Sequence, residues 1–419
     1  MIEQIKENLK NPEELEKLYH ADKKAFNVAF QSLYPEISDS DIAGYWKARL
    51  DYGESLVKKS KPQRWGIFSL IISCIVAAFL IKLPDIFNFN ENDTLFYFKN
   101  TGIIVFFGLS LYAIFTNKKI NKRNLIITAI AFLIPVIYIN LLPSDINSHS
   151  IILAYIHLPL LMWCIYGLVY IDFNKSDLVK RIDYIKYNGD LAILYALIAI
   201  TGMILTGVTI QLFIAIDFDI SNIYMNYIVI CGAVAAPIVA TYIMERYSVI
   251  TNKIAPIIAK IFSPLVLITL IIYLIVIAVT GKDPYNDREF LLVFNVMLLA
   301  VMAIIIYSVS GTSKESNNRF NNIQLFILTI VTLIIDLIAL SAILYRLNEF
   351  GISPNKIAVL GSNLLIFGNL VLIMIDLFKV NFKNSETEKV ELTISKYIPL
   401  YLLWIIIVVF AFPFIFGMK

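Results

Sequence analysis

Long apolar runs separated by short polar segments fill the chain from residue 65 to its end. A helix needs about 20 mostly apolar residues to cross a hydrocarbon core of roughly 30 Å, and most of these runs approach or reach that length. The pattern therefore predicts a bundle of membrane-spanning helices, an all-α polytopic fold. We place eleven spans, at Trp65–Leu83, Thr101–Phe115, Leu125–Leu142, Ile151–Ile171, Leu191–Ile214, Ile223–Ile243, Ser263–Val279, Phe290–Val309, Ile323–Tyr345, Ile357–Leu377 and Tyr397–Phe416.

The first 64 residues follow a different pattern, in which apolar residues recur at helical spacing among many charges. Asn11–Glu14, with the sequence Asn-Pro-Glu-Glu, is typical of a helix start. Pro35 is expected to end the helix that begins there. Ser38–Asp41 then predicts the start of the next helix.

These patterns divide the chain into residues 1–64, a small cytoplasmic helical hairpin, and residues 65–419, the multi-span membrane domain. One interpretation of the hairpin is that it packs on itself or on the membrane domain. The other is that residues 1–57 form a docking site for a cytoplasmic protein partner.

Composition agrees with a membrane protein and excludes several other classes. The chain is 58% hydrophobic and only 16% charged, against about a quarter charged in soluble domains. A net charge of +3 is too small to suggest a nucleic-acid partner, which leaves the lipid bilayer as the expected environment. Cys74, Cys164 and Cys231 stand singly in apolar runs, which argues against disulfides and metal sites. The sequence carries no P-loop, H-E-x-x-H or G-x-S-x-G pattern, so no catalytic residue, metal or cofactor is predicted.

The distribution of lysine and arginine predicts the orientation of the spans. Connections after even-numbered spans carry sixteen of these cations and the opposite side carries seven. Because cytoplasmic loops are enriched in Lys and Arg, the N-terminus is expected in the cytoplasm and, with an odd number of spans, the C-terminus outside. The seven outer cations are Lys82, Lys99, Lys282, Arg288, Arg346, Lys356 and Lys419.

Polar residues gather in the ninth and tenth spans. Asp336 lies deep in an apolar run, on the helix face that also carries Thr329 and Thr332. A charge at that depth costs about 2.5–3.5 kcal/mol on insertion scales, and such residues usually serve ions or protons. On the next span Ser362, Asn369 and Asp376 repeat every seven residues beside Gly361 and Gly368, a spacing that favours close helix contact. The alternative interpretation is that these residues only hold the two helices of a hairpin together.

The turn between these two spans contains ordinary signals for the end of one helix and the start of the next. It also contains charged residues that these signals do not explain. Gly351 suits a left-handed helix end, and Ser353 with Pro354 suits the start of the next helix. Arg346 and Glu349 are spaced to form an ion pair. Lys356 falls in the first turn of a helix, where the helix dipole disfavours a cation.

This turn resembles that of a family of bacterial membrane proteins grouped as domain of unknown function 4153. The family motif is an arginine, an acid-aromatic-glycine step, then Ser/Thr-Pro and a basic residue, often arginine, where this chain has lysine. The resemblance covers about a dozen residues and implies a multi-span protein of the bacterial inner membrane with no assigned chemistry. Its residues here are Arg346, Glu349, Phe350, Gly351, Ser353, Pro354, Asn355 and Lys356.

We therefore weigh three functions. The first is a permease-like or channel-like protein, with Asp336, Thr332, Asn369 and Ser362 along a polar path. The second is a membrane scaffold or sensor that recruits a partner through the N-terminal domain. The third is a membrane-embedded enzyme acting on a lipid-linked substrate. Transport predicts that water reaches Asp336, whereas a scaffold predicts a dry, packed seam.

Overall fold

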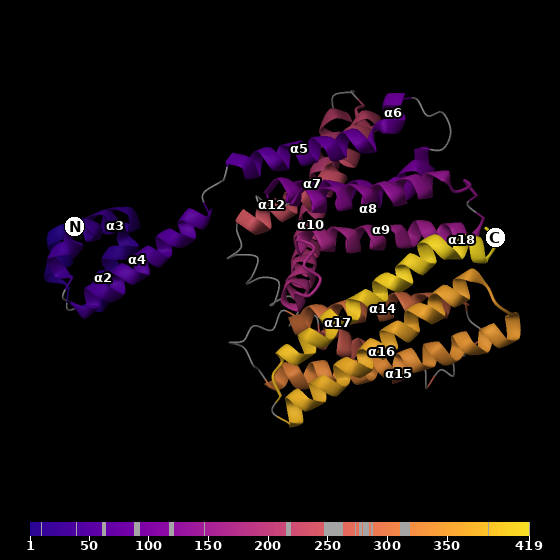
Figure 1. The fold of residues 1–419 in the computed structure, drawn as a ribbon. Coiled ribbons are helices and arrows are strands. Elements are labelled where there is room, and N and C mark those ends of the chain that lie inside the picture. Colours follow the sequence, from indigo (N-terminus) through magenta and orange to yellow (C-terminus); the bar gives the residue numbers. More distant parts are fainter. Residues whose placement is uncertain are drawn as a thin grey trace. The chain divides into compact units, whose positions relative to one another are not determined.

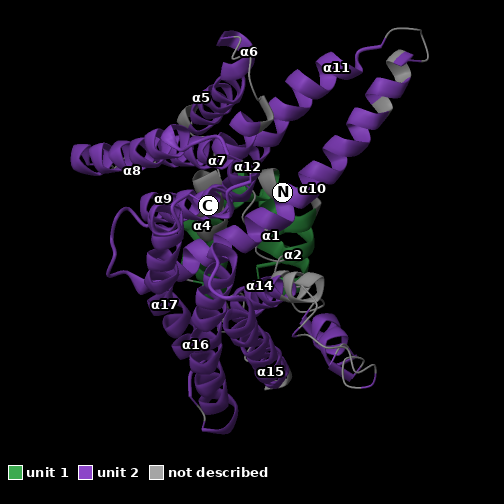
Figure 2. Cartoon of the chain, turned by 90° about the vertical axis from the view of Figure 1, so that its right-hand side faces the viewer, with its two compact units in different colours: residues 1–63 green, residues 64–419 purple. Residues whose placement is uncertain are grey.

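The computed structural model is all-α, with no strand among the residues that it describes (Figure 1). It contains two compact units, Met1–Gln63 and Arg64–Lys419, each with a core of its own (Figure 2). The division lies one residue before the predicted one. The described residues are 1–419 without 10, 39, 61–63, 88–92, 117–120, 146, 215–218, 247–262, 273, 276–278, 280–284, 286–287, 311–318, 384 and 419.

Unit 1 (Met1–Gln63) is a small helical bundle and not the predicted hairpin. Asn11 caps the second helix as expected, accepting a hydrogen bond from the backbone N–H of Glu14. Asp22 has an extended backbone and accepts a hydrogen bond from the N–H of Ala25, so it splits a stretch predicted as one helix. Pro35 lies inside the third helix and does not end it. The helices are α1 (Ile2–Glu7), α2 (Pro12–Ala21), α3 (Lys23–Ile37) and α4 (Asp41–Ser60).

Aromatic side chains form the centre of unit 1. Phe26 and Phe30 are completely buried, and the rings of Phe26 and Trp46 lie 5.0 Å apart between centroids. Val28 and Tyr45 are the opposite case, with 73% and 77% of their surface exposed. Singly exposed apolar residues are normal on protein surfaces. A docking site on residues 1–57 therefore stays a prediction.

Unit 2 (Arg64–Lys419) is a bundle of membrane-spanning helices. Eight described helices are long and apolar enough to cross a membrane, and three shorter apolar helices, at Gly66–Ile81, Ser263–Ile272 and Met297–Val309, overlap the other three predicted spans. The polytopic α-helical fold is thus confirmed, while the total of eleven spans stays a prediction. The elements are α5 (Arg64–Ile81), α6 (Leu83–Phe87), α7 (Asp93–Thr116), α8 (Lys122–Leu141), α9 (His149–Tyr170), α10 (Leu178–Ile214), α11 (Ser221–Ile223), the π-helical η1 (Tyr224–Val229), α12 (Ile230–Arg246), α14 (Arg288–Ser310), α15 (Arg319–Phe350), α16 (Pro354–Phe382), α17 (Glu388–Ile406), the π-helical η2 (Ile407–Ala411) and α18 (Phe412–Ile415).

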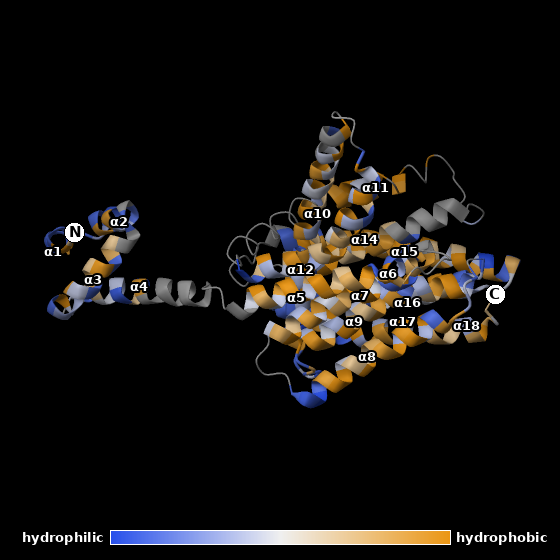
Figure 3. Cartoon of the chain, turned by 90° about the horizontal axis from the view of Figure 1, so that it is seen from above, coloured by the Kyte–Doolittle hydropathy of each residue, from blue (hydrophilic) through white to orange (hydrophobic). Residues whose placement is uncertain are grey.

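The outer faces of these helices carry many large apolar side chains. Ile75, Leu133 and Ile204 expose 61%, 55% and 64% of their surface, and orange covers most of the length of the long helices (Figure 3). A soluble helix would present charges there. The exposed apolar surface therefore faces lipid, and the chain is an integral membrane protein.

Contacts between distant segments show which helix ends lie together. At one end, the Ser395 hydroxyl of α17 donates to the carbonyl of Leu178, and the Arg181 guanidinium donates to the carbonyl of Ser395. At the other end, the Tyr138 hydroxyl of α8 donates to the carbonyl of Phe410. The turn between α15 and α16 lies at this second end (Figure 1).

Candidate functional site

Asp336 is the buried carboxylate of the bundle, as the sequence suggested. It lies near the middle of α15 and has no exposed surface. Neither of its carboxylate oxygens has a hydrogen-bond partner in the part of the chain that the structure describes. The Thr329 and Thr332 hydroxyls on the same face each donate to their own helix, to the carbonyls of Leu325 and Leu328, at 2.7 Å. These hydroxyls therefore do not satisfy the carboxylate.

The seven-residue polar repeat of α16 meets α17, not α15. The Trp404 indole N–H donates to the Ser362 hydroxyl at 3.2 Å, and the Asn369 amide donates to the Tyr401 hydroxyl at 3.1 Å. The repeat was predicted to bond to the preceding helix of the hairpin, α15. That prediction is wrong, because the observed partners lie on α17. Helical spacing shows that residues share a face, but it does not show which neighbour that face meets.

Glycine and charge extend this contact between α16 and α17 along the helices. The side chains of Trp404 and Tyr397 occupy the space beside Gly361 and Gly368, where larger residues would hold the helices apart. Towards the other end of the repeat, the Thr393 hydroxyl donates to Asp376 at 2.6 Å. Asp376 also forms an ion pair with Lys379 at 3.0 Å, as its place near the helix end indicated.

Three helices contribute polar groups around Asp336. Tyr401 of α17 lies close enough to Asp336 for electrostatic interaction and already accepts the Asn369 hydrogen bond. The Asn369 side-chain oxygen is buried and has no partner among the described residues. Asn369 and Tyr401 are joined by a hydrogen bond, and Tyr401 interacts electrostatically with Asp336. We call these three residues, of which Asp336 and Asn369 have unused hydrogen-bonding capacity, the Asp336 cluster.

Sequence reasoning missed two participants of this region. Tyr401 was not singled out, although Tyr397, Tyr401 and Trp404 are spaced along one face of the last long helix, and all three carry a polar group. Asn363 was also missed; its amide donates to the Asn295 side-chain oxygen of α14 at 2.7 Å. This contact joins α16 to α14.

The turn between α15 and α16 forms as its local sequence predicts. Gly351 has a φ of +69°, in the left-handed region that favours glycine. The Ser353 hydroxyl accepts a hydrogen bond from the backbone N–H of Lys356 at 3.4 Å, and Pro354 begins α16. These three residues therefore have a structural role that requires no ligand.

Lys356 and Arg346, the cations of the turn, interact with other residues of the same turn. Lys356 Nζ donates to the carbonyls of Phe350 and Gly351, at 3.0 and 2.6 Å. This lysine therefore caps the end of α15, where the helix dipole favours a cation, which resolves its unfavourable position at the start of α16. The Arg346 guanidinium lies over the Phe350 ring, 5.6 Å from its centroid. Arg346 and Glu349 form no ion pair within 4.0 Å, so that expectation is wrong.

Asp336 and this turn are separate features. A rise of about 1.5 Å per residue places the α-carbon of Asp336 roughly 15 Å along the helix from that of Arg346. No hydrogen bond or ion pair among the described residues joins the Asp336 cluster to the turn. The Asp336 cluster is therefore the candidate site, and the turn is a well-capped connection.

The described residues contain no group of three or more His, Cys, Asp or Glu side chains able to hold a metal ion. Comparison of the chain with family models, with curated proteins and with solved structures found no match in any of the three. The resemblance to the bacterial membrane family therefore stays a prediction.

Proposed function

We propose that this membrane protein is a permease-like or channel-like transporter in which Asp336 binds a proton or a cation. The observation that carries the proposal is the complete burial of Asp336 without a hydrogen-bond partner. If the residue served packing alone, its carboxylate would be expected to bond to the facing seam of Ser362 and Asn369. Both of those side chains are engaged with α17 instead.

Charge balance supports this role. An ionised carboxylate without a partner is very costly in an apolar interior. A proton or a cation must therefore accompany Asp336 when it is enclosed as here. The spare oxygen of Asn369 and the hydroxyl of Tyr401 would supply further ligands or a proton-transfer partner.

The present arrangement corresponds to an enclosed state of such a transporter. Asp336 has no exposed surface, which is the dry arrangement expected of a scaffold and not the water access expected of an open transporter. Transport therefore also requires that α17 separates from α16, which it contacts along Gly361 and Asn369, for loading and release. The contact of Gly361 with Trp404 and that of Asn369 with Tyr401 lie on this boundary. Alternating exposure of an intramembrane carboxylate is a common device of proton- and ion-coupled carriers.

Orientation and location complete the proposal. Lysine and arginine favour a cytoplasmic N-terminus and an external C-terminus, and the family resemblance favours the bacterial inner membrane. The turn at Gly351 and the polar groups near Lys99 would then face outward. The Asp336 cluster would lie near the middle of the bilayer.

Ion flux through purified protein in liposomes tests the proposed function. A trapped pH-sensitive dye reports proton entry under a potassium diffusion potential, and uptake of radioactive sodium reports a cation. Flux in the wild type that is lost in Asp336→Asn would support the proposal. Asp376→Asn is the matched control, because Asp376 is paired with Lys379 near a helix end, and it should retain flux. Wild-type liposomes that pass neither ion, or unchanged flux in Asp336→Asn, would contradict it.

A further inference from the structure

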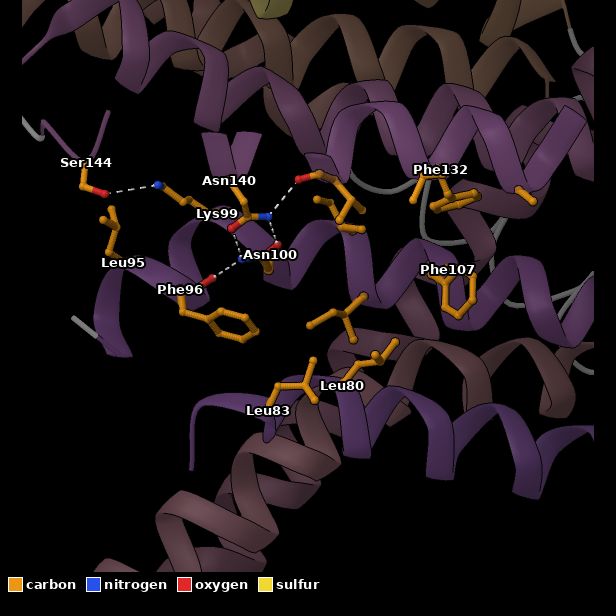
Figure 4. A pocket seen from close by; sticks show the side chains of 15 residues that line it. Leu80, Leu83, Leu95, Phe96, Lys99, Asn100, Phe107, Phe132, Asn140 and Ser144 are labelled. Carbon is orange, nitrogen blue, oxygen red and sulfur yellow. Dashed lines mark hydrogen bonds between the residues drawn. The ribbon is translucent and has the colours of Figure 1, made fainter. Parts of the chain in front are cut away.

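A groove of about 800 Å³ lies between α5, α7 and α8 (Figure 4). One face of α7 forms its floor, because Lys99, Ile103 and Phe107 recur at the spacing of a single helix face. Leu80 of α5 and Phe132 of α8 stand on its two sides. Its volume falls in the range of about 300–1,000 Å³ that is ordinary for small-molecule sites.

The groove is chemically divided along its length. Its polar groups, from Lys99, Asn100, Asn140 and Ser144, gather at one end, and carbon-only side chains line the rest (Figure 4). Helical rise puts the α-carbon of Phe107 about 12 Å from that of Lys99 along the floor. A ligand that fills this groove must therefore have a polar head and an apolar tail.

Lys99 supplies a positive charge at the polar end that no described carboxylate neutralises. Its surface is only 6% exposed, and its Nζ reaches the Ser144 hydroxyl at 3.4 Å and lies 5.3 Å from the centre of the Tyr155 ring. No carboxylate lies within 4.0 Å of it in the described part of the chain. Lys82, equally buried, pairs with Asp85 at 2.7 Å. Buried cations are normally paired in this way, so Lys99 lacks an anion among the described side chains.

The neighbouring amides are a fixed part of the site. Asn100 and Asn140 exchange hydrogen bonds at 3.2 and 3.0 Å, which ties α7 to α8 at the polar end. Beyond this link, Leu133 of α8 both lines the groove and has 55% of its surface exposed, so the groove opens on the surface of the bundle. A membrane lipid therefore has a route into the groove from the bilayer.

We infer that this groove binds an anionic phospholipid, with its phosphate against Lys99 and one acyl chain along the apolar floor. A soluble anion would leave the apolar length unfilled, and a lipid without net charge would leave Lys99 uncompensated. Lys99 is six residues from the first residue of α7, Asp93. That is about 9 Å along the helix, a depth at which a lysine meets lipid headgroups.

Native mass spectrometry of the full chain in a non-ionic detergent tests this inference with dioleoylphosphatidylglycerol as the probe. Lys99→Gln should weaken binding of this lipid about tenfold, the effect of losing one charge-assisted hydrogen bond. Lys82→Gln is the matched control, because it removes an equally buried lysine that already has an acidic partner, and it should leave binding unchanged. Equal binding by the wild type and Lys99→Gln would overturn the inference.

A second pair of variants tests the apolar floor with Lys99 intact. Ala129 lines the groove and its neighbour Ile130 does not, so Ala129→Trp should block the lipid and Ile130→Trp should not. If Lys99→Gln does not fold, the other variants decide whether the groove binds the lipid. Lys99→Arg is expected to retain binding, and the two tryptophan variants are expected to differ as stated. Unimpaired binding by Ala129→Trp would overturn the inference.

The choice of probe separates the sources of the ligand chemistry. Dioleoylphosphatidylcholine, which has the same chains and no net charge, should bind more weakly and show no dependence on Lys99. Glycerol phosphate, the headgroup without chains, should not displace the lipid. If glycerol phosphate binds as tightly as the lipid, the apolar floor contributes nothing and the assignment to a lipid is wrong.

Discussion

Lys356, in the first turn of α16, donates a hydrogen bond to the carbonyl oxygen of Gly351 at the end of α15, with an Nζ–O distance of 2.6 Å. The same Nζ donates to the carbonyl of Phe350, one of those that the end of α15 leaves open. The hairpin of α15 and α16 is thus closed by a residue whose position in its own helix is unfavourable. The residues of this turn accordingly have a structural role.

Removal of this cap should destabilise the protein. We expect Lys356→Met, which keeps the apolar stem and removes the charge, to lower stability by about 1–2 kcal/mol through lost hydrogen bonds and lost dipole interaction. Lys396→Met, at an exposed position inside α17, is the control, since Lys396 lies away from a helix end and none of its described contacts would be lost. Melting temperatures in detergent measure both, and an equal shift in the two variants would contradict the capping role.

The contact of Gly361 with Trp404 should tolerate no additional side chain. A methyl group on Gly361 would overlap the Trp404 ring, so Gly361→Ala should cost about 1–3 kcal/mol, as overpacking does. Gly202 is a helical glycine with open space around it, and Gly202→Ala should be neutral or stabilising by up to about 1 kcal/mol. Thermal unfolding of the two variants, with Gly361→Ala/Trp404→Leu as a rescue, checks this. If the double variant is no more stable than Gly361→Ala, overlap with the Trp404 ring is not the cause of the lost stability.

Asp336 of α15 and Asp376 of α16 should respond oppositely to the same substitution. Asp336→Leu removes a buried carboxylate that has no partner, so it should raise stability by about 1–3 kcal/mol. Asp376→Leu breaks bonds to Thr393 and Lys379 and should lower it. Chemical or thermal unfolding in detergent gives the sign of the change in stability for each variant. A loss of stability in Asp336→Leu as large as that in Asp376→Leu would indicate that Asp336 has a stabilising partner after all.

The orientation of the spans can be read by labelling introduced cysteines. In a background without Cys74, Cys164 and Cys231, Ile352→Cys is exposed in the turn between α15 and α16 and should react with an impermeant maleimide added outside intact cells. Ser176→Cys, in the connection between α9 and α10, should react only after permeabilisation. The reverse pattern would place the N-terminus outside.

Unit 1 (Met1–Gln63) should fold without the membrane unit. Its core is complete within its own sequence, so a fragment of residues 1–60 should be soluble and helical by circular dichroism. Phe26→Ala removes a completely buried ring and should cost about 3–5 kcal/mol, enough to unfold so small a domain. Val28→Ala, at an exposed position, should be neutral. A coil spectrum for the wild-type fragment would show that unit 1 depends on the rest of the chain.

The sequence by itself determined the class of the protein and several places where helices begin or end. A backbone in lipid must satisfy its hydrogen bonds internally, so each long apolar run had to become a helix. The cap at Asn11 and the turn at Gly351 and Ser353 depend on neighbouring residues alone, and these were predictable for that reason. The break at Asp22 was missed because the apolar periodicity continues across it, although its cause is a local cap.

Tertiary structure decided everything that depends on which helices meet. The repeat of Ser362 and Asn369 shows one face of α16, but only the fold assigns that face to α17 and leaves Asp336 without a partner. The groove that holds Lys99 likewise combines residues from α5, α7 and α8. The sequence showed Lys99 only as one of the cations on the outer side. Helical periodicity fixes directions around one axis, whereas the partner in each direction is set by packing among all the helices at once.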